Sequence, residues 1–307
     1  MDQPNKTQTA IPRAAPEDET PSPHFFSLDT GIGLELIESA RRQNAELGQL
    51  DVSLGGSQLY ATAQNHLRLL LQLLHMGVGR GQHERELQLE TAHTACQTGW
   101  FAEDAGMLDE AEWHYHHGIN MARTAGGKDF IVYGLTRLAA VALARENPKL
   151  CLSRLALAGH EAGEGSPWRS FMLMFAVEAH GRLGDGKTAE AALAKADALY
   201  DSREQDLVPD WAFWLPRPSA SSIAARSFLE LNPKLSASLY EGALGQLSTQ
   251  FVRSRLHLLA GLARAKLALG ETDLALSAAG EALRSLSSMG GAVPRVETLL
   301  VKFEARL

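Results

Sequence analysis

The chain has 307 residues, of which 45% are hydrophobic and 21% are charged, and its formal net charge is −7. This acidic balance excludes the strongly basic surface of proteins that hold nucleic acids mainly through phosphate contacts. No apolar run reaches the roughly 18 residues needed to cross a bilayer, and two cysteines are too few for a disulfide framework.

Residues 1–25 are predicted to form a disordered tail. They contain five of the twelve prolines and almost no bulky apolar residues. Such a stretch cannot bury enough surface to offset the entropy lost on ordering. The tail is either a leader without a role or a tether to another molecule. It lacks the apolar core of a secretion signal, so we expect a cytoplasmic protein without membrane contact.

Residues 26–307 are predicted to form one all-α domain. Ala, Leu, Arg and Glu recur at helical spacing, and no Val, Ile or Thr run alternates with polar residues as a strand would require. We expect one helix over residues 31–47, a second over 58–74, and a last helix over 293–307 that caps the domain.

Five repeated units follow the first two helices. Their anchor positions 106, 146, 184, 231 and 270 are 40, 38, 47 and 39 residues apart. In each unit a small residue stands five places after the anchor, a mostly larger residue four places further, and another small residue three places beyond. The five units read Gly106/Ala111/Tyr115/Gly118, Glu146/Cys151/Leu155/Ala158, Gly184/Ala189/Leu193/Ala196, Leu231/Ser236/Tyr240/Ala243 and Gly270/Ala275/Ala279/Ala282.

This pattern predicts stacked helical hairpins. A glycine at the anchor adopts a left-handed turn without steric cost, and small residues on the next helix let two backbones approach closely. The pattern resembles the tetratricopeptide repeat, which implies a right-handed superhelix of about six helical hairpins. The spacing exceeds the roughly 34 residues usual in that family and implies longer helices.

A second resemblance covers residues of about 58–230. The run from Leu89 to Gly106 and the segment Leu207–Trp214 are similar to the tetratricopeptide sensor region of actinobacterial helix-turn-helix transcriptional regulators. The resemblance implies a regulatory protein that binds a ligand or partner. The residues before this region hold too few apolar side chains for three packed helices, so we expect no direct DNA binding.

The same resemblance names a concave groove lined by the first helix of each hairpin. Aromatic side chains there would supply contact area, and a few charges would orient a ligand. Alternatively, the apolar members are simply core between neighbouring helices. The expected groove residues are His93, Trp100, Glu103, Asp104, Tyr133, Phe171, Met174, Glu178, Arg182, His257 and Arg264.

Three aromatic residues, Trp211, Phe213 and Trp214, fall in a proline-rich connection inside the longest repeat spacing. Such large side chains need a surface to cover. They either pack back on the solenoid, cover the groove as a lid, or form a subunit interface, which leaves a homodimer open.

Catalytic signals are absent from the sequence. It contains no phosphate-binding glycine loop and no nucleophile elbow. His114 and His117 share a helix face, but a closed metal site needs about four ligands. We therefore expect no enzyme, cofactor or metal, and two buried cysteines, Cys96 and Cys151. The function favoured is a regulatory protein that binds a peptide, small signal or protein partner in the groove. The alternative is an interaction scaffold or biosynthetic accessory protein without a small ligand.

Overall fold

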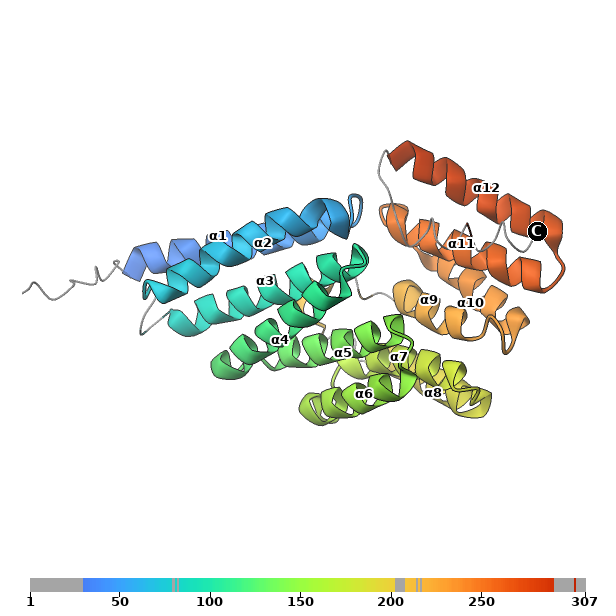
Figure 1. Ribbon diagram of the computed structural model, residues 1–307, viewed down its shortest axis with the longest axis horizontal. Helices are drawn as coiled ribbons and strands as arrows, with labels where there is room; N and C mark the ends of the chain where they lie inside the picture. Colours follow the sequence, from blue (N-terminus) through green and yellow to red (C-terminus); the bar gives the residue numbers. More distant parts are fainter. Residues whose placement is uncertain are drawn as a thin grey trace, which may run out of the picture.

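The computed structural model describes residues 30–78, 81, 83–201, 208–213, 215, 217–289 and 301. This part of the chain is helical throughout and contains no strand, which confirms the all-α prediction (Figure 1). The predicted tail 1–25 lies outside the described residues, as does the predicted helix 293–307 except for residue 301. Among the described helices, none combines the length and hydrophobicity that crossing a bilayer requires.

The helices follow one another with short connections. The expected helices over 31–47 and 58–74 are present and slightly longer, as α1 and α2. The elements are α1 (Thr30–Asp51), α2 (Gly56–His75), α3 (Glu84–Asp104), α4 (Leu108–Ala125), α5 (Lys128–Ala144), α6 (Pro148–Ala162), α7 (Trp168–Arg182), α8 (Gly186–Tyr200), the 3-10 helix η2 (Asp210–Ala212), α9 (Arg217–Ser227), α10 (Pro233–Gln246), α11 (Val252–Ala268) and α12 (Thr272–Met289).

Consecutive helices pack as hairpins. The pairs are α3 with α4, α5 with α6, α7 with α8, α9 with α10, and α11 with α12, and α2 packs along α3. Four of the five anchors have the positive φ expected of a tight turn: Gly106 (81°), Glu146 (57°), Gly184 (77°) and Gly270 (75°). The fourth unit instead uses Asn232, whose side chain caps α10 by accepting a hydrogen bond from the Leu235 amide.

The small residues lie where the two helices of a hairpin meet. Ala111, Cys151, Ala189, Ser236 and Ala275 are all fully buried, as the repeat register predicts. The larger residue and the second small residue of every unit are also buried. Two glycines on first helices leave room for tyrosine rings from second helices to pack against the backbone. A Cβ at Gly99 or Gly261 would lie 2.9 or 2.3 Å from the ring of Tyr115 or Tyr240.

The first helices of the hairpins, α3, α5, α7, α9 and α11, all contribute side chains to one internal cavity. Helix α1 packs against α3, and its last residue, Asp51, reaches the beginning of α11. The path of the chain therefore curves until its N-terminal helices and its last hairpin lie close together (Figure 1).

Candidate functional site

The cavity has a volume of about 980 Å³ and is lined mainly by α1, the first helices of the hairpins and residues 210, 211, 213 and 215, with Leu108 of α4 and Tyr240 of α10. This volume lies at the upper end of the range typical of small-molecule sites. Most of the residues expected in the groove line it. These are His93, Trp100, Glu103, Asp104, Tyr133, Phe171, Glu178, Arg182 and His257, together with Trp211 and Phe213.

Two expected groove residues do not line the cavity. Met174 is fully buried and packs with Ala189 of α8 and Phe228, between its own helix and these neighbours. Arg264 lies on α11 beyond Leu258, the last residue of that helix on the cavity wall. Trp214 lies outside the described residues.

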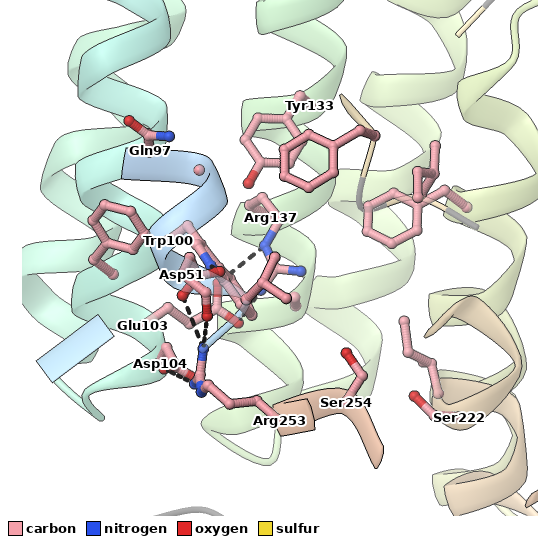
Figure 2. A pocket seen from close by; sticks show the side chains of 18 of the residues that line it. Asp51, Gln97, Trp100, Glu103, Asp104, Tyr133, Arg137, Ser222, Arg253 and Ser254 are labelled. Carbon is pink, nitrogen blue, oxygen red and sulfur yellow. Dashed lines mark hydrogen bonds and ion pairs between the residues drawn. The ribbon is translucent and has the colours of Figure 1, made fainter. Parts of the chain in front are cut away.

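An ion cluster joins the two ends of the chain. Arg253 of α11 donates to the Asp51 carboxylate at 2.8 Å and to the Asp51 carbonyl at 2.9 Å, and it also pairs with Asp104 (Figure 2). The Trp100 indole donates to Asp51 at 2.8 Å, and the Gly56 amide donates to Asp104 at 2.8 Å. Burial raises the pKa of Asp51. We call these three charged residues the 51–104–253 cluster.

The repeat pattern does not single out Asp51 or Arg253. A nearby feature of the sequence is Gly55. It has a φ of 94° and lies against the Arg253 guanidinium. A Cβ at Gly55 would come within 2.7 Å of the guanidinium carbon. The glycine therefore permits both the turn and the close approach of the arginine.

A second ion pair lies deeper in the cavity wall. Arg137 donates to the two oxygens of Glu103 at 3.1 and 2.5 Å, and the Tyr115 hydroxyl donates to the same carboxylate at 2.9 Å. The guanidinium carbon also lies 4.6 Å from the ring centre of Trp100. Both charged side chains are only 8% exposed. This bidentate geometry holds α3 against α5 and fixes the Trp100 ring.

The third cluster joins α7 to α9. Glu178 and Arg182, four residues apart on α7, form an ion pair with a distance of 2.6 Å. The spacing alone would suggest an exposed pair, but Glu178 is 2% exposed and also binds Arg226. Arg182 in turn donates to the Leu143 carbonyl at 2.6 Å. We call these residues the 178–182–226 cluster.

An aromatic cluster lies at the other end of the cavity, around Trp211. Its ring stacks on Phe130 at 4.9 Å and on Trp168 at 5.3 Å, and it contacts Tyr133 at 5.5 Å and His93 at 5.2 Å between ring centres. Trp211 therefore packs back on the helices and lines the cavity at the same time.

The histidines of α4 do not converge. His114 is buried and shares a hydrogen bond of 3.3 Å with the Tyr60 hydroxyl, while the Trp113 ring contacts both His114 and His117. Burial lowers the pKa of His114 to about 4. Within the described part of the chain, no three metal-binding side chains lie together. Cys96 and Cys151 are free and fully buried, as expected, and burial raises the pKa of each thiol to about 12.

Comparison with protein families and with curated proteins finds no match for this chain. Its function is therefore inferred from the cavity. That cavity combines an aromatic cluster around Trp211 with ionic groups that come from six different helices: α1, α3, α5, α7, α9 and α11.

Proposed function

We propose that this chain is a non-enzymatic regulatory protein of the tetratricopeptide type, which binds a peptide or small signal in its cavity. The observation that carries the proposal is one cavity of about 980 Å³ that combines stacked aromatic rings with hydrogen-bonded ionic groups. Such sites use aromatic surface for affinity and a few polar groups for orientation. The repeat register and the resemblance to actinobacterial regulators support a right-handed superhelix with a role in transcriptional regulation.

Binding is favoured over catalysis because the ionic groups already bind one another. Glu103 accepts hydrogen bonds from Arg137 and Tyr115, and both Asp51 oxygens accept from Arg253 or Trp100. A general base or nucleophile must present a reactive atom to the substrate. Carboxylates engaged in this way are suited to fixing the shape and polarity of a binding site.

The arrangement also suggests how binding could be transmitted to a protein partner. In a solenoid each hairpin contacts mainly its neighbours, so its curvature is easily altered. Here a ligand would touch helices that are far apart in the sequence, from α1 to α11. Its differential affinity for open and closed curvatures would shift the population between them.

The test is a tryptophan that fills the cavity. Ser254 of α11 lines the cavity, whereas Ser238 is exposed on α10, so Ser254→Trp and Ser238→Trp form a matched pair. Small molecules or peptides that co-purify with the native protein should be identified by mass spectrometry and added back in melting experiments. We expect the wild type and Ser238→Trp to bind and be stabilised, and Ser254→Trp to lose both properties.

A different outcome would favour the alternative function. If a protein partner binds equally well to the wild type and to Ser254→Trp, with no small molecule present, the chain is an interaction scaffold. The proposal of a ligand-binding cavity would then be wrong.

A further inference from the structure

The cavity is amphiphilic along its length. The aromatic residues Phe130 and Trp168 lie in the first turns of α5 and α7, whereas Glu103 and Arg182 lie in the last turns of α3 and α7. First helices of stacked hairpins run in the same direction, so the aromatic cluster around Trp211 lies where α5 and α7 begin, whereas Glu103 and Arg182 lie where their helices end. The Arg41–Glu90 ion pair also lines the cavity, on the side of His93, and Trp100 lies among the ions. In Figure 2, Tyr133 lies at one side, and Arg137, Glu103 and Arg253 follow away from it, with Trp100 beside Asp51.

The two outer ion clusters differ in their balance of charge. The 51–104–253 cluster has two carboxylates and one guanidinium, and the Trp100 indole and the Gly56 amide also donate to Asp51 and to Asp104. The 178–182–226 cluster has two guanidinium groups that share one buried carboxylate. Counted over the described residues, the first cluster has one more carboxylate than guanidinium, whereas the second has one more guanidinium than carboxylate.

The excess charge faces the cavity. Arg182 and Arg226 both line it, and their side chains are 37% and 28% exposed. The Arg226 Nε is buried and has no hydrogen-bond partner within the described residues. The nearest other carboxylate on the wall, Glu103, already binds Arg137 in a bidentate pair. The exposed parts of the Arg182 and Arg226 side chains are therefore open to an acceptor brought by a ligand.

We propose that the ligand is an amphiphilic anion. Its acidic group, a carboxylate, phosphate or sulfonate, binds Arg182 and Arg226, and its aromatic or aliphatic body extends towards Trp211. Guanidinium groups recognise such planar or tetrahedral anions through paired, charge-assisted hydrogen bonds. This inference rests on the proposed function and narrows it to a class of ligand.

Two fluorescent dyes test the inference. 1-Anilinonaphthalene-8-sulfonate carries an acidic group on an aromatic body, and N-phenyl-1-naphthylamine has the same body without that group. We expect Arg226→Gln and Arg182→Gln each to weaken binding of the sulfonate dye by about ten- to a hundred-fold, as loss of a charge-assisted bond implies. The uncharged dye should change by less than about two-fold, and Arg226→Lys should retain part of the sulfonate affinity.

Arg123→Gln is the matched control. Arg123 is 53% exposed on α4, so the substitution removes the same charge outside the cavity. Melting curves show which variants fold. If Arg226→Gln does not fold, the dye affinities of Arg182→Gln decide the test. Equal weakening of both dyes, or unchanged sulfonate binding, would overturn the anionic ligand. If Ser254→Trp nevertheless abolishes binding of both dyes, the dyes bind in the cavity and the proposed cavity function stands. If Ser254→Trp binds both dyes as well as the wild type does, both proposals fail.

Discussion

Replacing Arg253 by methionine tests whether the 51–104–253 cluster holds α1 and α3 against α11. Arg253→Met keeps the length of the side chain and leaves Asp51 and Asp104 without their shared cation. The side chains of these aspartates are 20% and 7% exposed, so their charges are poorly solvated. Breaking a buried pair in this way typically costs about 3–5 kcal/mol. The measurement is the free energy of unfolding in urea at pH 7.

The control is Arg255→Met, two residues further along α11. Arg255 and its partner Glu281 are 41% and 42% exposed, so the expected cost is below about 1 kcal/mol. A double-mutant cycle with Asp51→Asn should recover part of the loss, because a neutral amide no longer needs the guanidinium. Equal costs for Arg253→Met and Arg255→Met, or no coupling to Asp51→Asn, would refute a stabilising role of the cluster.

Three further predictions concern packing and pH. Gly261→Ala should destabilise by about 1–3 kcal/mol because its Cβ would overlap the Tyr240 ring, whereas Gly242→Ala, whose Cβ meets nothing within 4 Å, should be neutral or stabilising. Ala189→Leu should cost about 1–3 kcal/mol, and an unchanged melting temperature would disprove the repeat register. His114 stays neutral when folded, so the unfolded chain binds more protons between pH 6.5 and about 4. Stability should fall by up to about 3 kcal/mol on acidification through that window, and His114→Gln should flatten the measured profile.

The hairpin register was predictable from the sequence because it depends only on the spacing of residues within each hairpin. A small residue five places after a turn must meet the preceding helix, whatever the rest of the chain does. Ala111, Ala189 and Ala275 are fully buried for this reason. The cavity wall was expected from the resemblance to the tetratricopeptide repeat, which implies that the first helix of each hairpin lines a groove. His93, Trp100 and Glu103 are expected there by that resemblance, and they line the cavity.

The contacts across the cavity were not predictable in this way. Asp51 and Arg253 are 202 residues apart, and their pairing depends on the curvature accumulated over all the hairpins between them. The burial of Glu178 depends on Arg226 from the next unit, so its helical spacing to Arg182 suggested only an exposed pair. Met174 was expected in the groove because of its position along α7. A rotation of α7 by part of a turn decides which neighbouring helix such a residue faces, and the sequence does not give that rotation.

The central claim is that the cavity is the binding site. A crystal structure of the chain with 1-anilinonaphthalene-8-sulfonate tests it most directly. We predict the dye inside the cavity, with its sulfonate at Arg182 and Arg226 and its rings towards Trp211. The outer face of α4 offers a different aromatic surface, where Trp113 is 56% exposed. Dye bound there, with the cavity empty, would contradict the account.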